Sequence, residues 1–137
     1  MSSPLSASSA PALALPLSAA VLLGHGSREP GTEVEIRNLA AEMGATSPEW
    51  RLTHAFLNQE PKLDSAVAAL AAEGVLRIKV LPLLVFTGKH ILEDVPQEIE
   101  TLRARHPSIQ FELAPHLSRL SGFTGIIADV LKESGPQ

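Results

Sequence analysis

Residues 19–28 read AAVLLGHGSR and carry the clearest indication of the fold in this sequence. Five consecutive apolar residues that stop at Gly24 are typical of a strand buried on both faces of a parallel sheet. Gly24 and Gly26 free the backbone for a tight turn, which lets His25 project from the end of the strand. The stretch therefore predicts a strand followed by a loop that carries a candidate functional side chain.

Downstream of this strand, helical and strand patterns alternate. Helices are expected over residues 32–44, 61–74, 96–105 and 123–131, and strands over residues 51–57, 75–85 and 109–113. This order implies right-handed βαβ units, hence a parallel sheet with helices on both faces. We expect a single α/β domain with about four strands in the flavodoxin-like order 2-1-3-4, without an internal repeat.

Local signals set the expected helix ends. Thr32 and Glu35 have the spacing of a capping box, so the first helix should begin at Thr32 and end at Gly44. Pro96 suits the first turn of the third helix. Pro82 lies within a predicted strand, where proline is acceptable near the end.

The composition excludes several classes of function. The chain has 137 residues, 45% hydrophobic and 19% charged, which fits one ordinary globular domain. Its formal net charge of −4 argues against nucleic-acid binding, which depends on clustered Lys and Arg. The absence of Cys excludes disulfides, thiolate metal sites and catalytic thiols, so any metal ligands must be N or O donors.

The ends of the sequence are expected to lie outside the domain at residues 19–133. Residues 1–18 are rich in Ser, Ala, Pro and Leu without a Lys or Arg, so we interpret them as a disordered leader rather than a signal peptide. Residues 134–137 are interpreted as a tail. No stretch reaches the roughly 20 apolar residues of a membrane span, and a cytoplasmic location is expected.

Two loops carry the side chains that could bind a metal or take part in catalysis. The loop after the first strand holds His25, and residues 86–90, FTGKH, follow the third strand with His90 at their end. In the 2-1-3-4 order these strands are neighbours, and ligands bind where their carboxyl ends meet. Two imidazoles suit cobalt, nickel, iron or zinc and leave coordination positions open. A histidine can also accept protons near neutral pH.

Positive charges flank both histidines. Arg28 and Lys89 would supply an acidic protein with local cations for a ligand that carries several carboxylates. Two other interpretations stay open: the first loop as a glycine-rich turn or a phosphate-binding loop, and His90 as a helix cap. His54 and His106 are expected to be structural, whereas His116, after the fourth strand, is a candidate for lining the same edge.

Four pieces of the sequence resemble one family. They are HGSR at 25–28, AFL at 55–57 before Glu60 and Pro61, PLLVFTGKH at 82–90 before DVP at 94–96, and APH at 114–116. In this order, over roughly residues 20–133, they resemble the short sirohydrochlorin cobalt-chelatases. These are class II chelatases of the CbiX type, a class that includes siroheme ferrochelatases and archaeal nickel chelatases.

The resemblance implies an activity and a site. It implies insertion of a divalent metal into sirohydrochlorin or a related tetrapyrrole, with cobalt favoured over iron or nickel, for corrinoid or siroheme synthesis and without a nucleotide. His25 and His90 would hold the metal. Asn58 stands where the family usually has a glutamate, which leaves Glu60 as the substitute acid. The residues expected to contact the tetrapyrrole are Ser27, Arg28, Phe86, Gly88, Lys89 and His116.

A homodimer is also expected, because one small domain offers only a sheet edge to a broad, flat ligand, whereas two domains can enclose it. Longer members of the resembled family carry two such domains in one chain. Two rival hypotheses remain: a noncatalytic carrier of metal or tetrapyrrole, and an interaction or phosphate-binding domain with structural histidines. The metal is left open because imidazole sites do not by themselves select one.

Overall fold

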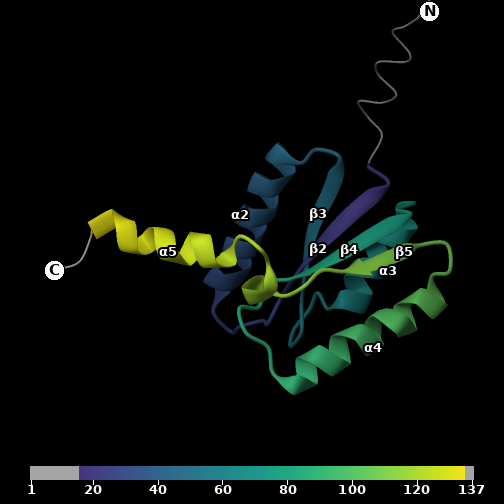
Figure 1. Cartoon of the computed structure of the whole chain (residues 1–137). Helices are drawn as coiled ribbons and strands as arrows, with labels where there is room; N and C mark the ends of the chain where they lie inside the picture. Colours follow the sequence, from purple (N-terminus) through teal and green to yellow (C-terminus); the bar gives the residue numbers. More distant parts are fainter. Residues whose placement is uncertain (1–15, 135–137) are drawn as a thin grey trace, which may run out of the picture.

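The molecule is built on one parallel sheet of four strands. A computed structural model describes residues 16–134, apart from the side chains of His90 and Ser134. The strands are β2 (Ser18–Gly24), β3 (Trp50–Phe56), β4 (Arg77–Pro82) and β5 (Gln110–Leu113), in the order β3-β2-β4-β5 (Figure 1). All three pairings are parallel. The predicted α/β class and the 2-1-3-4 order are therefore confirmed.

Helices cover both faces of this sheet, as expected. The covering helices are α2 (Pro30–Thr46), α3 (Leu63–Ala72) and α4 (Lys89–Arg105), and a short 3-10 helix η1 (Leu117–Arg119) and the terminal helix α5 (Phe123–Ser134) follow β5. The larger core cluster joins α3 and α4 to one face of the sheet, and a smaller cluster joins α2 to the other. Most of the leader predicted at residues 1–18 lies outside the described residues, and Ser18 already belongs to β2.

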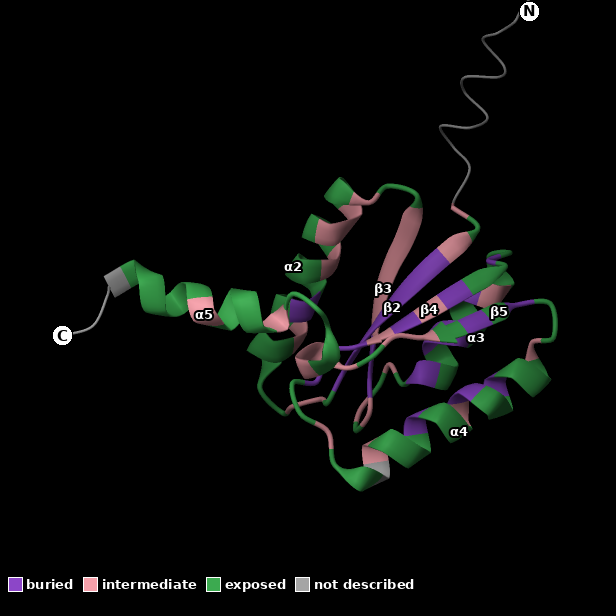
Figure 2. Cartoon of the chain, in the orientation of Figure 1, coloured by how far each residue is buried: buried purple, intermediate pink, exposed green. Residues whose placement is uncertain are grey.

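The central strand β2 explains why the sequence begins with a continuous apolar run. Val21 and Leu23 pack into the larger cluster, whereas Leu22 points the other way, toward Ile36 of α2 and Phe56 of β3. Because both faces are covered, every residue from Ala19 to Gly24 is buried (Figure 2). This is the burial pattern of an inner strand in a parallel sheet.

Three predicted helix starts are wrong. α3 begins at Leu63, two residues after the predicted start at Pro61. α2 begins at Pro30, two residues before Thr32, because proline suits the first turn of a helix, and it continues past Gly44. α4 begins at Lys89 and contains Pro96. Continuation through this proline is explained by the burial of Val95, which precedes it, together with other apolar side chains of the same helix face. Pro82 is the last residue of β4, which therefore ends three residues before the predicted end at residue 85.

The terminal helix α5 forms where its apolar pattern predicts it. It contributes no side chain to either core cluster, and its main packing partner among the described elements is η1. Within residues 16–134, no helix has both the length and the apolar character that crossing a bilayer demands.

One polar contact ties α2 to β3. The ring of His54 is packed against Phe56, and its Nε2 donates to Oε2 of Glu33 at 3.1 Å. Arg37, one turn along the helix, contacts the same oxygen at 3.1 Å. The hydrogen bond from His54, followed by the charge of Arg37, lowers the pKa of Glu33 below its ordinary value of 4.5. His54 is thus structural, as the sequence indicated.

We predict that replacing Leu102 with Ala lowers the free energy of unfolding by about 2–5 kcal/mol, because Leu102 is 1% exposed and its loss leaves a cavity beneath α4. Leu92→Ala is a matched control on the same helix, since that leucine is 54% exposed and its loss should cost less than about 0.5 kcal/mol. Urea titration of both variants measures the difference. Equal losses would contradict the assignment of the core.

The lowered pKa of Glu33 predicts a dependence of stability on pH. A carboxylate with a lowered pKa stabilises the fold above its unfolded pKa, and this contribution is lost as the pH falls through the folded value. Acidification from pH 6 through the ordinary value of 4.5 should therefore destabilise the parent more than Glu33→Gln. Thermal unfolding of both proteins, with Glu35→Gln as control, tests this. Parallel curves for the parent and Glu33→Gln would count against it.

Candidate functional site

The predicted site residues gather at the carboxyl edge of the sheet. β2 and β4 are parallel neighbours, with Leu23 opposite Pro82 at their ends. The loop that carries His25 and the segment that leads to His90 consequently leave the sheet at the same edge. This confirms the arrangement expected from the strand order. The separation of the two imidazoles stays a prediction, because the side chain of His90 is not described.

The loop after β2 is held in place by the segment that follows β3. Backbone hydrogen bonds run from Leu57 N to Gly24 O at 2.9 Å and from Asn58 N to His25 O at 3.1 Å. The Ser27 amide donates to Oε1 of Gln59 at 3.0 Å. These bonds continue the β2–β3 pairing beyond the last strand residues. The loop that presents His25 is therefore fixed by two neighbouring chain segments.

Gly26 is required by this arrangement. Its φ is +101°, a conformation that side chains disfavour, and an added Cβ would lie 3.3 Å from Cγ of Gln59. Both the backbone geometry and the close neighbour therefore favour glycine. The tight turn predicted from the sequence is present at this position.

The ring of His25 has one described partner. Its Nδ1 lies 2.9 Å from the amide nitrogen Nδ2 of Asn58, and the direction of this hydrogen bond depends on the histidine tautomer and on the orientation of the amide. Asn58 thus stands next to the candidate metal ligand. The sequence pointed to this position only as a departure from the resembled family, and nothing in the sequence indicated the role of Gln59.

An open crevice lies beside His25. It has a volume of about 510 Å³ and is walled by apolar side chains of α2 and of the sheet, with Thr32 and Glu35 at its polar part. The apolar wall consists of Ile36, Leu39, Phe56 and Leu83. A crevice with apolar walls and a few polar groups is the usual form of a small-molecule site.

The segment after β4 differs from the predicted loop. Gly88 is the N-cap of α4, and His90 is the second residue of this helix. The prediction that His90 lies in a loop is therefore wrong, because its backbone is helical. The helix begins early because the buried apolar face of α4 extends it beyond Pro96 toward its N-terminus. Lys89 is exposed at the first helical position, and Phe86 is 79% exposed in the preceding loop.

The other predicted residues lie near this edge with differing contacts. Ser27 Oγ accepts the amide of Glu29 at 3.0 Å, just before α2, while Arg28 is exposed. Nδ1 of His116 is 3.5 Å from Oγ1 of Thr87, which lies in the loop that precedes α4.

Glu60 has partners at the start of α3. Its Oε1 accepts from the Lys62 amide at 3.2 Å and from Ser65 Oγ at 2.9 Å. These bonds stabilise the first turn of that helix. The catalytic role suggested for Glu60 stays a prediction.

The described side chains alone do not form a complete metal site. Among them, no three His, Asp or Glu groups come together in a way that could hold an ion. A metal at His25 would need donors other than the described side chains, such as His90, a nitrogen atom of a bound ligand, or water. The metal-binding role expected for His25 and His90 therefore stays a prediction.

The chain is similar to known metal chelatases. It is 31% identical over 94 residues to a sirohydrochlorin ferrochelatase of Bacillus subtilis (strain 168), covering 67% of this chain and 36% of that protein. It is 32% identical over 76 residues to a sirohydrochlorin cobaltochelatase of Methanococcoides burtonii, covering 55% and 58%. The chain thus spans less than two thirds of the length of either relative.

A solved structure agrees over nearly the whole domain. A CbiX protein of Marinobacter aquaeolei VT8 superposes with a TM-score of 0.73 at 30% identity, covering 85% of this chain and 95% of that one. The sequence model of the CbiX family matches residues 19–134, from the buried strand β2 through α5. With the parallel sheet and its two histidine-bearing segments at one edge, this match shows that the chain belongs to the CbiX family.

Proposed function

We propose that this protein inserts a divalent metal into sirohydrochlorin or a closely related reduced tetrapyrrole. The observation that carries the proposal is the position of His25, which lines an open crevice at the sheet edge where the segment bearing His90 also emerges. Relatives that are named sirohydrochlorin chelatases support the substrate class. The proposal includes a cytoplasmic location and a role in corrinoid or siroheme synthesis.

The chemistry requires exchange of protons for metal. Two pyrrole N–H protons leave the macrocycle as the metal enters, so the site must both deliver an ion and accept protons. His25 and His90 would perform both tasks. The exposed cations Arg28 and Lys89 would orient substrate carboxylates. Phe86, which is largely exposed, would stack on the macrocycle.

Cobalt is our first choice of metal, with iron and nickel as alternatives. Imidazole donors do not by themselves select one of these ions, and the availability of each metal often decides which one is bound. The relatives include both a cobaltochelatase and a ferrochelatase by name. We also propose a homodimer, because the crevice is open and one domain would leave most of a broad macrocycle in solvent.

A second candidate is a carrier that binds metal without accelerating insertion. The contact between Asn58 and His25 favours it, because a carboxylate would accept a proton more readily than this amide. The two functions differ in one measurable quantity, the rate of metal insertion compared with the uncatalysed rate.

We predict that His25→Ala and His90→Ala each lower the cobalt insertion rate by roughly 100-fold or more, because each removes a metal donor and a proton acceptor. The double variant should lose little more, since residues that work as a unit are not additive. Insertion is measured by absorbance, with each divalent metal in turn. His106→Ala, at the C-cap of α4, is the matched control and should retain the parent rate.

Three outcomes separate the hypotheses. A carrier would show no insertion above the uncatalysed rate in the parent, with metal affinity reduced in each variant. Structural histidines would give variants of lower stability and unchanged metal binding. A folded double variant that inserts cobalt at the parent rate, with its fold checked by circular dichroism, would overturn the proposed mechanism.

Asn58 is proposed as the residue that positions His25. A histidine that binds metal through Nε2 usually donates its Nδ1–H to an oxygen. If Oδ1 of Asn58 faces Nδ1, the amide accepts that proton and leaves the Nε2 lone pair for the metal. In the structure the amide nitrogen faces Nδ1, and when that nitrogen donates, the histidine proton lies on Nε2 and blocks this coordination. Rotation of one amide would therefore decide which nitrogen is available.

We predict that Asn58→Leu lowers cobalt affinity by about 10–100-fold, because it removes the partner of Nδ1. Asn58→Asp should preserve or raise the affinity, since a carboxylate only accepts. Titration of the cobalt d–d absorption measures both. Asn38→Leu, on the exposed surface of α2, is the matched control. Unchanged cobalt affinity in a folded Asn58→Leu variant would contradict this role.

A further inference from the structure

The crevice beside His25 contains a carboxylate. The residues of α2 that line it are Thr32, Glu35, Ile36 and Leu39. Their spacing is that of a single helix face, in which every third or fourth residue points the same way. Ile36 fixes the direction of this face, because it is buried against Phe56 of the sheet. A ligand that fills the crevice would therefore contact both His25 and Glu35.

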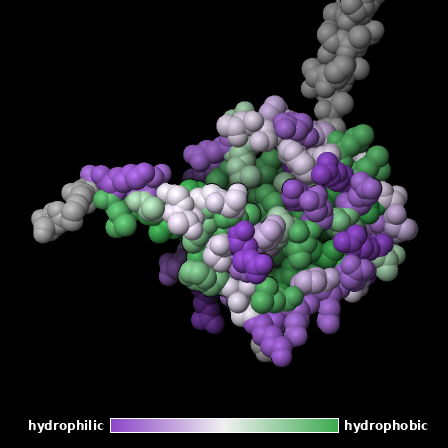
Figure 3. Space-filling view, in the orientation of Figure 1, coloured by the Kyte–Doolittle hydropathy of each residue, from purple (hydrophilic) through white to green (hydrophobic). Residues whose placement is uncertain are grey.

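The other acids near this edge are engaged elsewhere. Among the described residues, Glu35 is the only acid that lines the crevice. Glu33, on the same helix, is bonded to His54 and Arg37. Glu60 accepts two hydrogen bonds at the start of α3. The helix α5 projects from the domain (Figure 1) and carries its hydrophilic side chains along one side (Figure 3), and no described residue of it lines the crevice.

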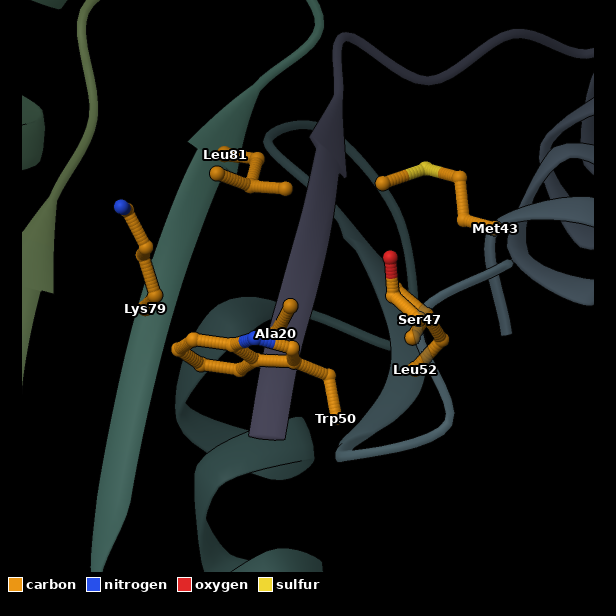
Figure 4. A pocket seen from close by; sticks show the side chains of 7 residues that line it. All are labelled: Ala20, Met43, Ser47, Trp50, Leu52, Lys79 and Leu81. Carbon is orange, nitrogen blue, oxygen red and sulfur yellow. The ribbon is translucent and has the colours of Figure 1, made fainter. Parts of the chain in front are cut away.

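A second hollow on the same face of the sheet lacks such a group. It has a volume of about 200 Å³ and lies farther along α2, at Met43. Its lining is mainly apolar, and Figure 4 shows the indole of Trp50 lying across β2. Lys79 is the one ionisable side chain among the described residues that line it, and its Nζ is 3.5 Å from Oε2 of Glu112. On this face, the groups suited to proton transfer lie in the crevice and not in the hollow.

Metal insertion needs a proton acceptor that does not hold the metal. Two pyrrole N–H bonds break, the divalent metal takes the place of the two protons, and no electrons are transferred. A histidine nitrogen whose lone pair binds the metal cannot accept a proton at the same time. While the histidines still hold the ion, the first proton therefore needs another acceptor. A carboxylate that is exposed, as that of Glu35 is, can accept this proton and pass it on to water.

We propose that Glu35 is a further catalytic residue, which accepts the first pyrrole proton on its carboxylate while His25 and His90 hold the metal. The protonated acid then returns this proton to solvent through the open mouth of the crevice. The second proton passes to an imidazole once the metal has left it for the macrocycle. The assignment rests on the proposed function, because it describes one step of metal insertion.

We expect Glu35→Gln to lower the cobalt insertion rate at saturating substrate by roughly 100-fold, because an amide does not accept the proton. Cobalt affinity, measured by the d–d absorption, should stay at the parent value, since Glu35 does not hold the metal. Glu42→Gln is the matched control and should retain the parent rate, because Glu42 is exposed on the same helix and does not line the crevice.

Rescue by a small carboxylate distinguishes proton transfer from a structural role. Added acetate should restore part of the insertion rate of Glu35→Ala, because it can occupy the space that the side chain leaves. The same acetate concentration should not raise the rate of His25→Ala or of the parent. A loss of rate in Glu35→Ala without rescue would indicate that Glu35 acts through the structure of the crevice, which contradicts the proposal.

Other outcomes overturn the inference in distinguishable ways. An unchanged rate in Glu35→Gln, in a parent that does insert cobalt, would reject the role of Glu35 and leave the proposed function intact. A reduced cobalt affinity of Glu35→Gln would make the carboxylate a metal ligand and reject its role as proton acceptor. A loss of rate in Glu60→Gln alone would assign the proton to Glu60. A parent that does not exceed the uncatalysed rate would reject the proposed function, and the role of Glu35 with it.

Discussion

Burial of β2 on both faces determines how the other strands and helices are arranged. A strand in the middle of a parallel sheet must satisfy its backbone groups through two neighbours and hide side chains from water on both sides. β2 meets both demands, because it pairs with β3 and β4 and its residues from Ala19 to Gly24 are buried. At its carboxyl end the chain leaves the apolar interior, so the residues that follow can be polar and can contact a ligand.

The loop that carries His25 is held by backbone hydrogen bonds that continue the pairing of the sheet. The amide of Leu57 bonds to Gly24 and that of Leu83 to Leu23, so the segments after β3 and β4 both fix the end of β2. His25 is thereby presented by ordered backbone, although it lies in a loop. Preorganisation of this kind allows a ligand to bind without first ordering its site. The position of one histidine thus follows from the same pairing that builds the fold.

Much of this could be predicted from the sequence, and the errors have physical causes. The apolar run before Gly24 predicted the inner strand, and alternating patterns predicted the sheet order. The start of α4 was missed because Pro96 is a local signal for a helix start, whereas burial of the helix face is a tertiary effect. The contact of Asn58 with His25 could not be predicted, because it joins residues 33 positions apart through side chains. The amphipathic pattern predicted α5 but not what its apolar side contacts.

The unequal layers have a consequence for motion. The larger cluster unites α3 and α4 with the sheet, whereas α2 is held by few buried side chains, among them Leu22, Ile36 and Phe56. Local opening takes the least free energy where the fewest apolar contacts are broken. Backbone amides of α2 should therefore exchange with deuterium before those of α3 and α4. Since α2 forms one wall of the crevice, such local opening would widen the mouth of the crevice without disturbing α3 and α4.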